Sequence, residues 1–159
     1  MTKTTTALLG FHYKNKYYVA YQESNGEPCQ LGKNVVSEIK EVILNDQLEE
    51  WKKQFHELTV VNDLVQPILQ DIENLKPFTD LEVSRCSEND WYCLTYKCKG
   101  SLQKILDSKY LYNYVNENWF PYFQDYAYIL NFDCDMLDFY EDSLVKKSYY
   151  LSEYQLPNW

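Results

Sequence analysis

Residues Ala7–Gln22 read ALLGFHY-KN-KYYVAYQ, and this stretch decides the fold. Two runs rich in aromatic and β-branched residues, Ala7–Tyr13 and Lys16–Gln22, flank the polar pair Lys14–Asn15. Runs of this composition joined by a short polar connection are typical of a β-hairpin. The sequence therefore predicts two antiparallel strands here, followed by a polar loop.

A second hairpin is expected near the other end of the chain. Asp125–Phe132 and Met136–Tyr140 have the same aromatic and β-branched character, and the polar residues Asp133–Asp135 separate them. A further run, Lys147–Tyr154, is a candidate for an additional edge strand. The chain is thus expected to begin and end in β-structure.

Between the hairpins, apolar residues recur every three or four positions, which is typical of amphipathic helices. Three helices are expected first; the second has Asp46 as its N-cap, and the third begins at Asn62 or Asp63. Their apolar faces are Val35, Val36, Ile39, Val42 and Ile43; Leu48, Trp51, Phe55 and Leu58; and Leu64, Ile68, Ile72 and Leu75. The segment Trp91–Tyr96 fits a helix and a strand about equally, and we favour the helix. Another helix is expected after Ser101.

These elements predict an α+β fold with a single domain over residues 1–159. A chain of 159 residues is of ordinary size for one domain and long enough to bury a substantial core. Each sheet and each helix must bury an apolar face against another layer. We therefore expect one antiparallel sheet, made by the N- and C-terminal hairpins, packed against a helical middle.

The chain is acidic. Asp and Glu total 24 and Lys and Arg total 15, which gives a formal net charge of −9, and Arg85 is the single arginine. Nucleic-acid binding draws most of its affinity from clustered Lys and Arg, so direct binding of nucleic acid is disfavoured. A protein partner with a basic surface is easier to accommodate.

The cysteines indicate a reducing compartment and no metal site. They form an odd, scattered set without a C-x-x-C pair: Cys29, Cys86, Cys93, Cys98 and Cys134. We expect structural thiols, no metal and no cofactor. The sequence has no apolar run of transmembrane length and no signal-type apolar core near its start, so we expect a cytoplasmic protein that does not bind membranes.

Several positions follow a recognisable order: Gly10-Phe11, Tyr21, Pro28, Leu31-Gly32, Tyr126-Ala127-Tyr128, Asp133 and Phe139-Tyr140. In this order and spacing the chain resembles a little-described group of small bacterial and phage proteins. That group has a Gly-Phe strand, then a second strand ending in Tyr with the loop Asn-His-Phe-Asp-Ser-Tyr-Pro-x-x-Leu-Gly, and a late Tyr-Ala-Tyr strand. Here Gln22–Glu27 replaces the polar positions of the loop. The resemblance implies the organisation of the fold and no particular activity.

The loop after the first hairpin is a candidate site, with Glu23, Asn25 and Glu27 as its polar residues. If the protein is a small hydrolase, Glu23 is the candidate general base. That role requires a pocket beside the loop and a carboxyl group with a raised pKa.

The densest acidic group consists of Asp133, Asp135, Asp138, Glu141 and Asp142. Its D-x-D start resembles a calcium loop, but the oxygen ligand and the glycine required further on are missing. We interpret it as a hairpin tip or as a surface for a basic partner. The residues Trp119, Phe120 and Tyr122 are expected in an exposed loop and form a second candidate contact surface.

The preferred hypothesis is therefore a non-enzymatic acidic interaction protein of a bacterium or phage. An inhibitor or modulator of a basic nucleic-acid-processing or defence protein is one concrete form. The alternative is the small hydrolase with its site at Glu23–Glu27.

Overall fold

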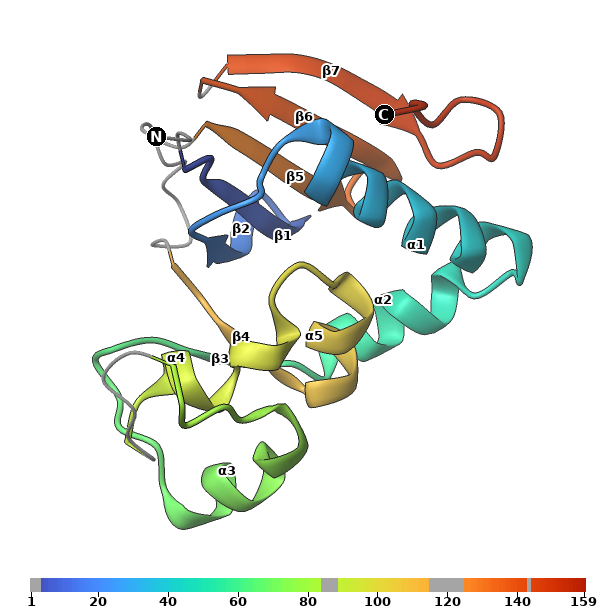
Figure 1. Ribbon diagram of the computed structural model, residues 1–159. Helices are drawn as coiled ribbons and strands as arrows, with labels where there is room; N and C mark the ends of the chain where they lie inside the picture. The colour runs from blue at the N-terminus through green and yellow to red at the C-terminus, as the bar shows by residue number, and fades with distance from the viewer. Residues whose placement is uncertain (1–3, 84–88, 115–124, 143) are drawn as a thin grey trace.

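A five-stranded sheet lies at the centre of the computed structural model, which describes residues 4–83, 89–114, 125–142 and 144–159 (Figure 1). Its strand order is β2-β1-β5-β6-β7. The strands are β1 (Ala7–Tyr13), β2 (Lys16–Gln22), β5 (Tyr126–Asn131), β6 (Met136–Glu141) and β7 (Leu144–Tyr150). Both predicted hairpins are confirmed, and the predicted edge strand is present as β7, although it begins and ends earlier than expected.

The two hairpins join through β1 and β5, which run parallel from Ala7↔Tyr126 to His12↔Asn131. The α+β class is therefore confirmed, whereas the expectation of a purely antiparallel sheet is wrong, because this sheet is mixed. The alternation of apolar residues determines which face of a strand is buried, but not the direction in which two distant strands meet. The long segment between β1 and β5 provides the crossover that parallel neighbours require.

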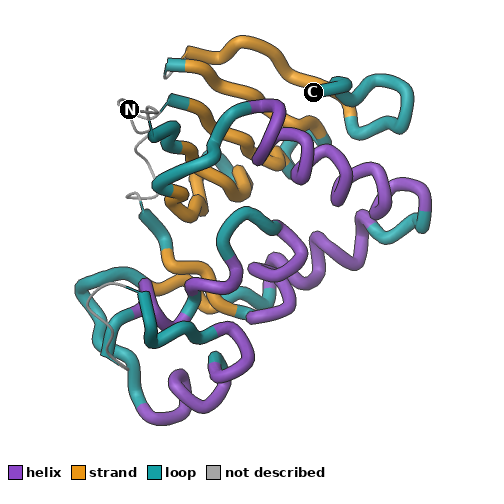
Figure 2. The backbone as a smooth tube through the Cα atoms, in the orientation of Figure 1, coloured by secondary structure: helices purple, strands orange, loops and turns teal. Residues whose placement is uncertain are grey.

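Three helices pack against one face of this sheet (Figure 1, Figure 2). They are α1 (Lys33–Leu44), α2 (Leu48–His56) and α5 (Leu102–Ser108), and a short π-helical turn, η1 (Pro28–Gly32), precedes α1. The predicted helices that correspond to α1, α2 and α5 are confirmed, but the N-cap of α2 is Gln47 and not Asp46. Asp46 has a φ of 54°, which belongs to the turn after α1 and not to a helix start. No helix in the described ranges is long and apolar enough to span a bilayer.

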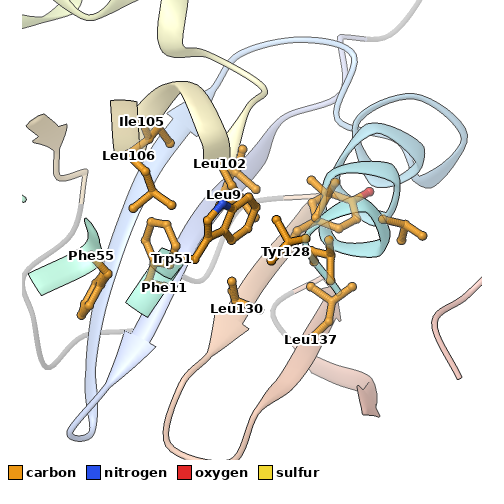
Figure 3. Packing of buried hydrophobic residues seen from close by; sticks show 14 of the residues in the cluster. Leu9, Phe11, Trp51, Phe55, Leu102, Ile105, Leu106, Tyr128, Leu130 and Leu137 are labelled. Carbon is orange, nitrogen blue, oxygen red and sulfur yellow. The ribbon is translucent and has the colours of Figure 1, made fainter. Parts of the chain in front are cut away.

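Aliphatic and aromatic side chains together fill the core between the sheet and these helices (Figure 3). Phe11 of β1 is fully buried, and its ring centroid lies 5.1 Å from that of Phe55 in α2 and 5.7 Å from that of Phe132. After β7 the chain turns back, and the Trp159 ring lies 4.9 Å from Phe139 and 5.4 Å from Tyr128. Residues from both ends of the chain therefore share one core.

The remaining elements form a smaller lobe, which we call the β3–β4 lobe (Figure 1). It contains β3 (Thr59–Val61), β4 (Tyr110–Tyr112), α3 (Leu69–Asn74), α4 (Trp91–Leu94) and the 3₁₀ turns η2 (Lys76–Phe78) and η3 (Tyr96–Cys98). The strands β3 and β4 are parallel, and the lobe has its own buried cluster around Leu75, Trp91 and Leu94. The favoured helix within Trp91–Tyr96 is confirmed as α4, whereas the strands β3 and β4 were not predicted from the sequence.

The predicted third helix is largely wrong. It begins at Leu69 and not at Asn62 or Asp63, and Leu64 and Ile68, expected to face the core, are 92% and 64% exposed. Pro67 lies inside the apolar repeat and disfavours a helical conformation of the residue before it, so the helix starts only after it.

Candidate functional site

The loop after β2 places Glu23 in a network with two residues of the β3–β4 lobe. The Glu23 carboxylate forms an ion pair with Lys99, and the Tyr92 hydroxyl donates a 2.9 Å hydrogen bond to Glu23 Oε1. The Lys99 ammonium also lies 4.1 Å from the centroid of the Tyr92 ring and 5.1 Å from that of Tyr96. A cation over aromatic faces beside a carboxylate is held from several sides.

This network lowers the pKa of Glu23. Partial burial alone would raise it, but the hydrogen bonds from Lys99, from the backbone and from Tyr92 favour the ionised carboxylate and together outweigh burial. Burial and the same carboxylate raise the pKa of the Tyr92 hydroxyl. The raised pKa predicted for a carboxyl group at this loop is therefore wrong for Glu23, since its carboxylate is a weaker base than an ordinary glutamate.

The other loop candidates do not converge with Glu23. Asn25 is exposed in the left-handed region, with a φ of 58°. Glu27 Oε1 accepts a 2.8 Å hydrogen bond from the Thr5 hydroxyl, which precedes β1. Between them, the Gly26 carbonyl accepts a 2.7 Å hydrogen bond from the buried Tyr128 hydroxyl. The loop is thus fastened to the sheet, and its two carboxylates have different partners.

A cavity of about 800 Å³ lies beside this network, between the sheet and the β3–β4 lobe. Five tyrosines line it: Tyr21, Tyr92, Tyr110, Tyr112 and Tyr114. Apolar residues of β1, β2, α5 and β4 also contribute: Leu9, Ala20, Ile105 and Leu111. A second, more open hollow contains Glu23 and Asn25, and Gln22, Lys99 and Gly100 border both. The concavity expected beside the loop is therefore present.

The acidic residues at the start of β6 are engaged within the protein. Asp133 accepts hydrogen bonds from the backbone N–H groups of Lys14, at 2.8 Å, and Asn15, at 3.2 Å, which lower the pKa of its carboxyl group. Asp135 forms a 2.8 Å ion pair with Lys52 of α2. Both residues therefore fasten one part of the fold to another.

The remaining acidic candidates lie elsewhere on the same hairpin. Asp138 is buried within β6 and accepts hydrogen bonds from Asn131 Nδ2, at 3.0 Å, and from the Ser148 hydroxyl, at 2.7 Å. Glu141 and Asp142 lie at the far end of β6, about 17 Å from its start for a six-residue strand. The prediction of one acidic surface is therefore not supported by their positions. The aromatic candidates Trp119, Phe120 and Tyr122 lie outside the described residues.

One surface feature was missed by the sequence analysis: the apolar segment Leu64–Leu69, which leads into α3 and includes its first residue. Four of its side chains are largely exposed: Leu64 by 92%, Val65 by 59%, Ile68 by 64% and Leu69 by 85%. The sequence analysis assigned Leu64 and Ile68 to the inner face of a helix. The proline within the segment was the available signal that a helix does not form there.

The histidines and cysteines of the described ranges form no recognisable catalytic arrangement. The His12 ring stacks on Tyr17 at 4.3 Å, and its buried nitrogens have no hydrogen-bond partner among the described residues. Burial raises the pKa of the Cys98 thiol to about 11, which keeps it protonated and unreactive. Within the described ranges, no group of three or more His, Cys, Asp or Glu side chains is arranged to hold a metal ion.

The ion pair gives the first testable prediction. A lowered folded-state pKa means that Glu23 stabilises the fold above its unfolded pKa, and that this contribution is lost as the pH falls through the folded value. Glu23→Gln should therefore lower the free energy of unfolding by about 1 kcal/mol at neutral pH, because the pair is partly exposed. The difference from wild type should therefore shrink as the pH falls below the range in which an ordinary glutamate carboxyl group titrates, and vanish once Glu23 is protonated in the folded protein. Urea unfolding across this pH range measures it.

Glu49→Gln is the matched control. Glu49 also pairs with a lysine, Lys52, at 3.4 Å, but its side chain is 87% exposed. This substitution should leave the unfolding free energy unchanged at every pH. Equal effects of the two substitutions would contradict the special status of the Glu23–Lys99 pair.

Comparison of the chain with protein-family models, curated proteins and solved structures finds no match. Its function is therefore inferred from its own geometry and charge.

Proposed function

We propose that this protein is an acidic interaction protein that binds a protein partner through the apolar segment Leu64–Leu69. The observation that supports this most is the exposure of four large apolar side chains within six consecutive residues. Single exposed apolar residues are ordinary, whereas contiguous exposed apolar groups mark contact surfaces. The proposed site of action is the cytoplasm.

The segment is held in one shape, which favours binding. Its backbone is fixed at both ends: Leu64 N–H donates to Asn62 Oδ1 at 2.9 Å, and Ile68 N–H donates to Asp71 Oδ2 at 3.0 Å. Its middle is fixed by Trp91, whose indole N–H donates to the Val65 carbonyl at 2.6 Å. A segment that is already ordered loses little conformational entropy on binding.

Charge around the segment indicates the chemistry of the partner. Between residues 59 and 83 the chain has five acidic residues and one basic residue: Asp63, Asp71, Glu73, Asp80 and Glu82 against Lys76. An apolar segment within an acidic stretch of sequence is complementary to an apolar pocket framed by Lys and Arg. The partner is therefore a protein with a basic surface, and a nucleic-acid-processing or defence enzyme is the class with such a surface near its active site. Modulation of that enzyme is the proposed consequence of binding.

The test uses paired substitutions of exposed leucines. The double variant Leu64→Ser and Leu69→Ser removes two apolar contacts, and the control Leu44→Ser removes a leucine that is 63% exposed on α1. Wild type, double variant and control serve as immobilised baits in lysate of the source cells, with quantitative mass spectrometry. We expect at least about a tenfold loss of one captured protein with the double variant and none with the control.

The captured protein is then purified and titrated with all three baits at low and high salt. Direct binding that is lost in the double variant and weakened by salt supports the proposal. Equal capture by all three proteins contradicts it. Concentration-dependent dimerisation of the wild type alone, abolished in the double variant, also contradicts it, because the occupant would then be a second copy of this chain.

A further inference from the structure

The walls of the 800 Å³ cavity are fixed in place by carboxylates. Three of its five tyrosine hydroxyls donate hydrogen bonds to acidic side chains: Tyr92 to Glu23 at 2.9 Å, Tyr110 to Asp71 at 2.7 Å and Tyr112 to Asp63 at 2.6 Å. Charge-assisted hydrogen bonds of this kind are short and strong. The rings are therefore held before any ligand arrives, and their hydroxyls are already engaged.

The other two tyrosines stand at the edge of the sheet. The rings of Tyr21 and Tyr114 are stacked, with centroids 4.8 Å apart and an interplanar angle of 19°. The Tyr114 N–H donates a 2.8 Å hydrogen bond to the Val19 carbonyl, so the residues after β4 attach to the outer edge of β2. This attachment joins the β3–β4 lobe to the sheet and fixes the aromatic pair beside the cavity.

The size and lining of the cavity suit a small flat molecule. A volume of about 800 Å³ lies within the range of ligand sites, which are commonly 300–1,000 Å³. Its apolar part is formed by Leu9, Ala20, Ile105 and Leu111, and its aromatic part by the five tyrosines. Aromatic walls whose hydroxyls are already used favour stacking over the many hydrogen bonds that a sugar requires.

The charges around the cavity select against anions. Among the described residues that line the cavity, Lys99 is the one cation, and its ammonium is already engaged by Glu23 and by two tyrosine rings. Asp63 lines the cavity, and Asp71 lies behind Tyr110. A negatively charged ligand would meet carboxylates without a free counter-charge from Lys99, whereas a cation would gain from both carboxylates and ring faces.

We infer that this cavity is a binding site for a planar N-heteroaromatic molecule that is neutral or positively charged. The molecule stacks against the tyrosine walls, and its ring nitrogens face the carboxylate side of the cavity. Asp63 and Leu64 belong to both the cavity lining and the partner surface of the preceding section. The inference itself rests on the ring positions and charges of the cavity, so it stands or falls by its own test.

The test uses three fluorescent probes that share one ring system and differ in charge: acridine, N-methylacridinium and acridine-9-carboxylate. Each is titrated with the purified protein and its fluorescence or anisotropy is followed. We expect the neutral and cationic probes to bind, and the anionic probe to bind at least about tenfold more weakly. The inference is overturned if the anionic probe binds as strongly as the cationic probe. It is also overturned if the neutral and the cationic probes both fail to bind.

Substitutions locate the binding. Tyr112→Ala removes one aromatic ring from the cavity wall and should lower the affinity for the cationic probe at least about tenfold. Tyr150→Ala is the control: this tyrosine of β7 is 61% exposed, and its removal should leave the affinity unchanged. Asp63→Asn, at an exposed residue, should keep the fold and lower the preference for the cation over the neutral probe. If Tyr112→Ala fails to fold by circular dichroism, Tyr112→Phe replaces it, and we expect a smaller loss because the ring is kept but released from Asp63. If none of the cavity variants changes the affinity for the probes, the inference is overturned.

Discussion

Gly10→Ala is expected to destabilise the protein by about 4 kcal/mol, at the upper end of the range for a single substitution. A Cβ atom at position 10 would lie 2.0 Å from the Tyr18 carbonyl oxygen and 2.7 Å from the Val19 Cα atom. Both atoms belong to the backbone of β2, which pairs with β1 at Gly10↔Val19. No side-chain rotation relieves such a clash, so the two strands must separate. Urea unfolding measures the loss.

Ala20→Gly is the matched control. Ala20 lies at the adjacent register position, Leu9↔Ala20, and this substitution removes a Cβ atom whereas Gly10→Ala adds one. Ala20→Gly should lower the free energy of unfolding by about 1 kcal/mol, because glycine has greater backbone freedom in the unfolded chain. Gly10→Ser should be as damaging as Gly10→Ala, since both add the same atom. A stable Gly10→Ala protein would show that β1 and β2 are not as close at this position as described.

Trp159→Ala is expected to lower the free energy of unfolding by about 3 kcal/mol, which is the second largest effect that we expect. The Trp159 ring packs against Phe139 and Tyr128, and it also lies 5.9 Å from Tyr149, so it covers the helix-facing side of β5, β6 and β7. It also fits closely over Gly32, where an added Cβ atom would lie 2.6 Å from Trp159 Cε3. Removing the ring leaves an opening between α1 and the sheet. Thermal unfolding followed by near-ultraviolet circular dichroism measures this loss.

Tyr154→Ala is the control for this second prediction. Tyr154 belongs to the same segment after β7 and is 89% exposed. Its removal should change the unfolding free energy by less than about 0.5 kcal/mol. Similar losses for the two aromatic residues would indicate that the segment stabilises the protein without specific docking of Trp159.

Much of the fold was accessible from the sequence because its patterns are local. The Ala7–Tyr13 and Lys16–Gln22 runs and the three- and four-residue spacing of α1 each report on neighbouring residues, and all three are confirmed. The strands β3 and β4 have only three residues each, too few for a periodic pattern to be recognised. Their pairing also depends on contacts between residues 59–61 and 110–112, which no local pattern records.

The site was less accessible, because it depends on which side chains meet across long distances in the chain. Glu23 was identified as a candidate from its loop, but its partner Lys99 is 76 residues away, and that partner reverses the expected direction of its pKa shift. Asp133 and Asp135 were grouped with Glu141 because they are neighbours in sequence. Their positions at opposite ends of a strand separate them. The exposure of Leu64 also went unrecognised, because helical spacing alone does not report where a proline stops the helix.

The parallel pairing of β1 with β5 sets the order in which this protein is completed during translation. Ala7 is synthesised well before its neighbour Tyr126, because β2, the helices and β3 and β4 lie between them in the chain. Until then, one edge of the first hairpin remains unpaired and open to association with other nascent chains. The sheet can therefore be completed only after β5 has been synthesised, and the closing of this long-range contact is expected to slow folding.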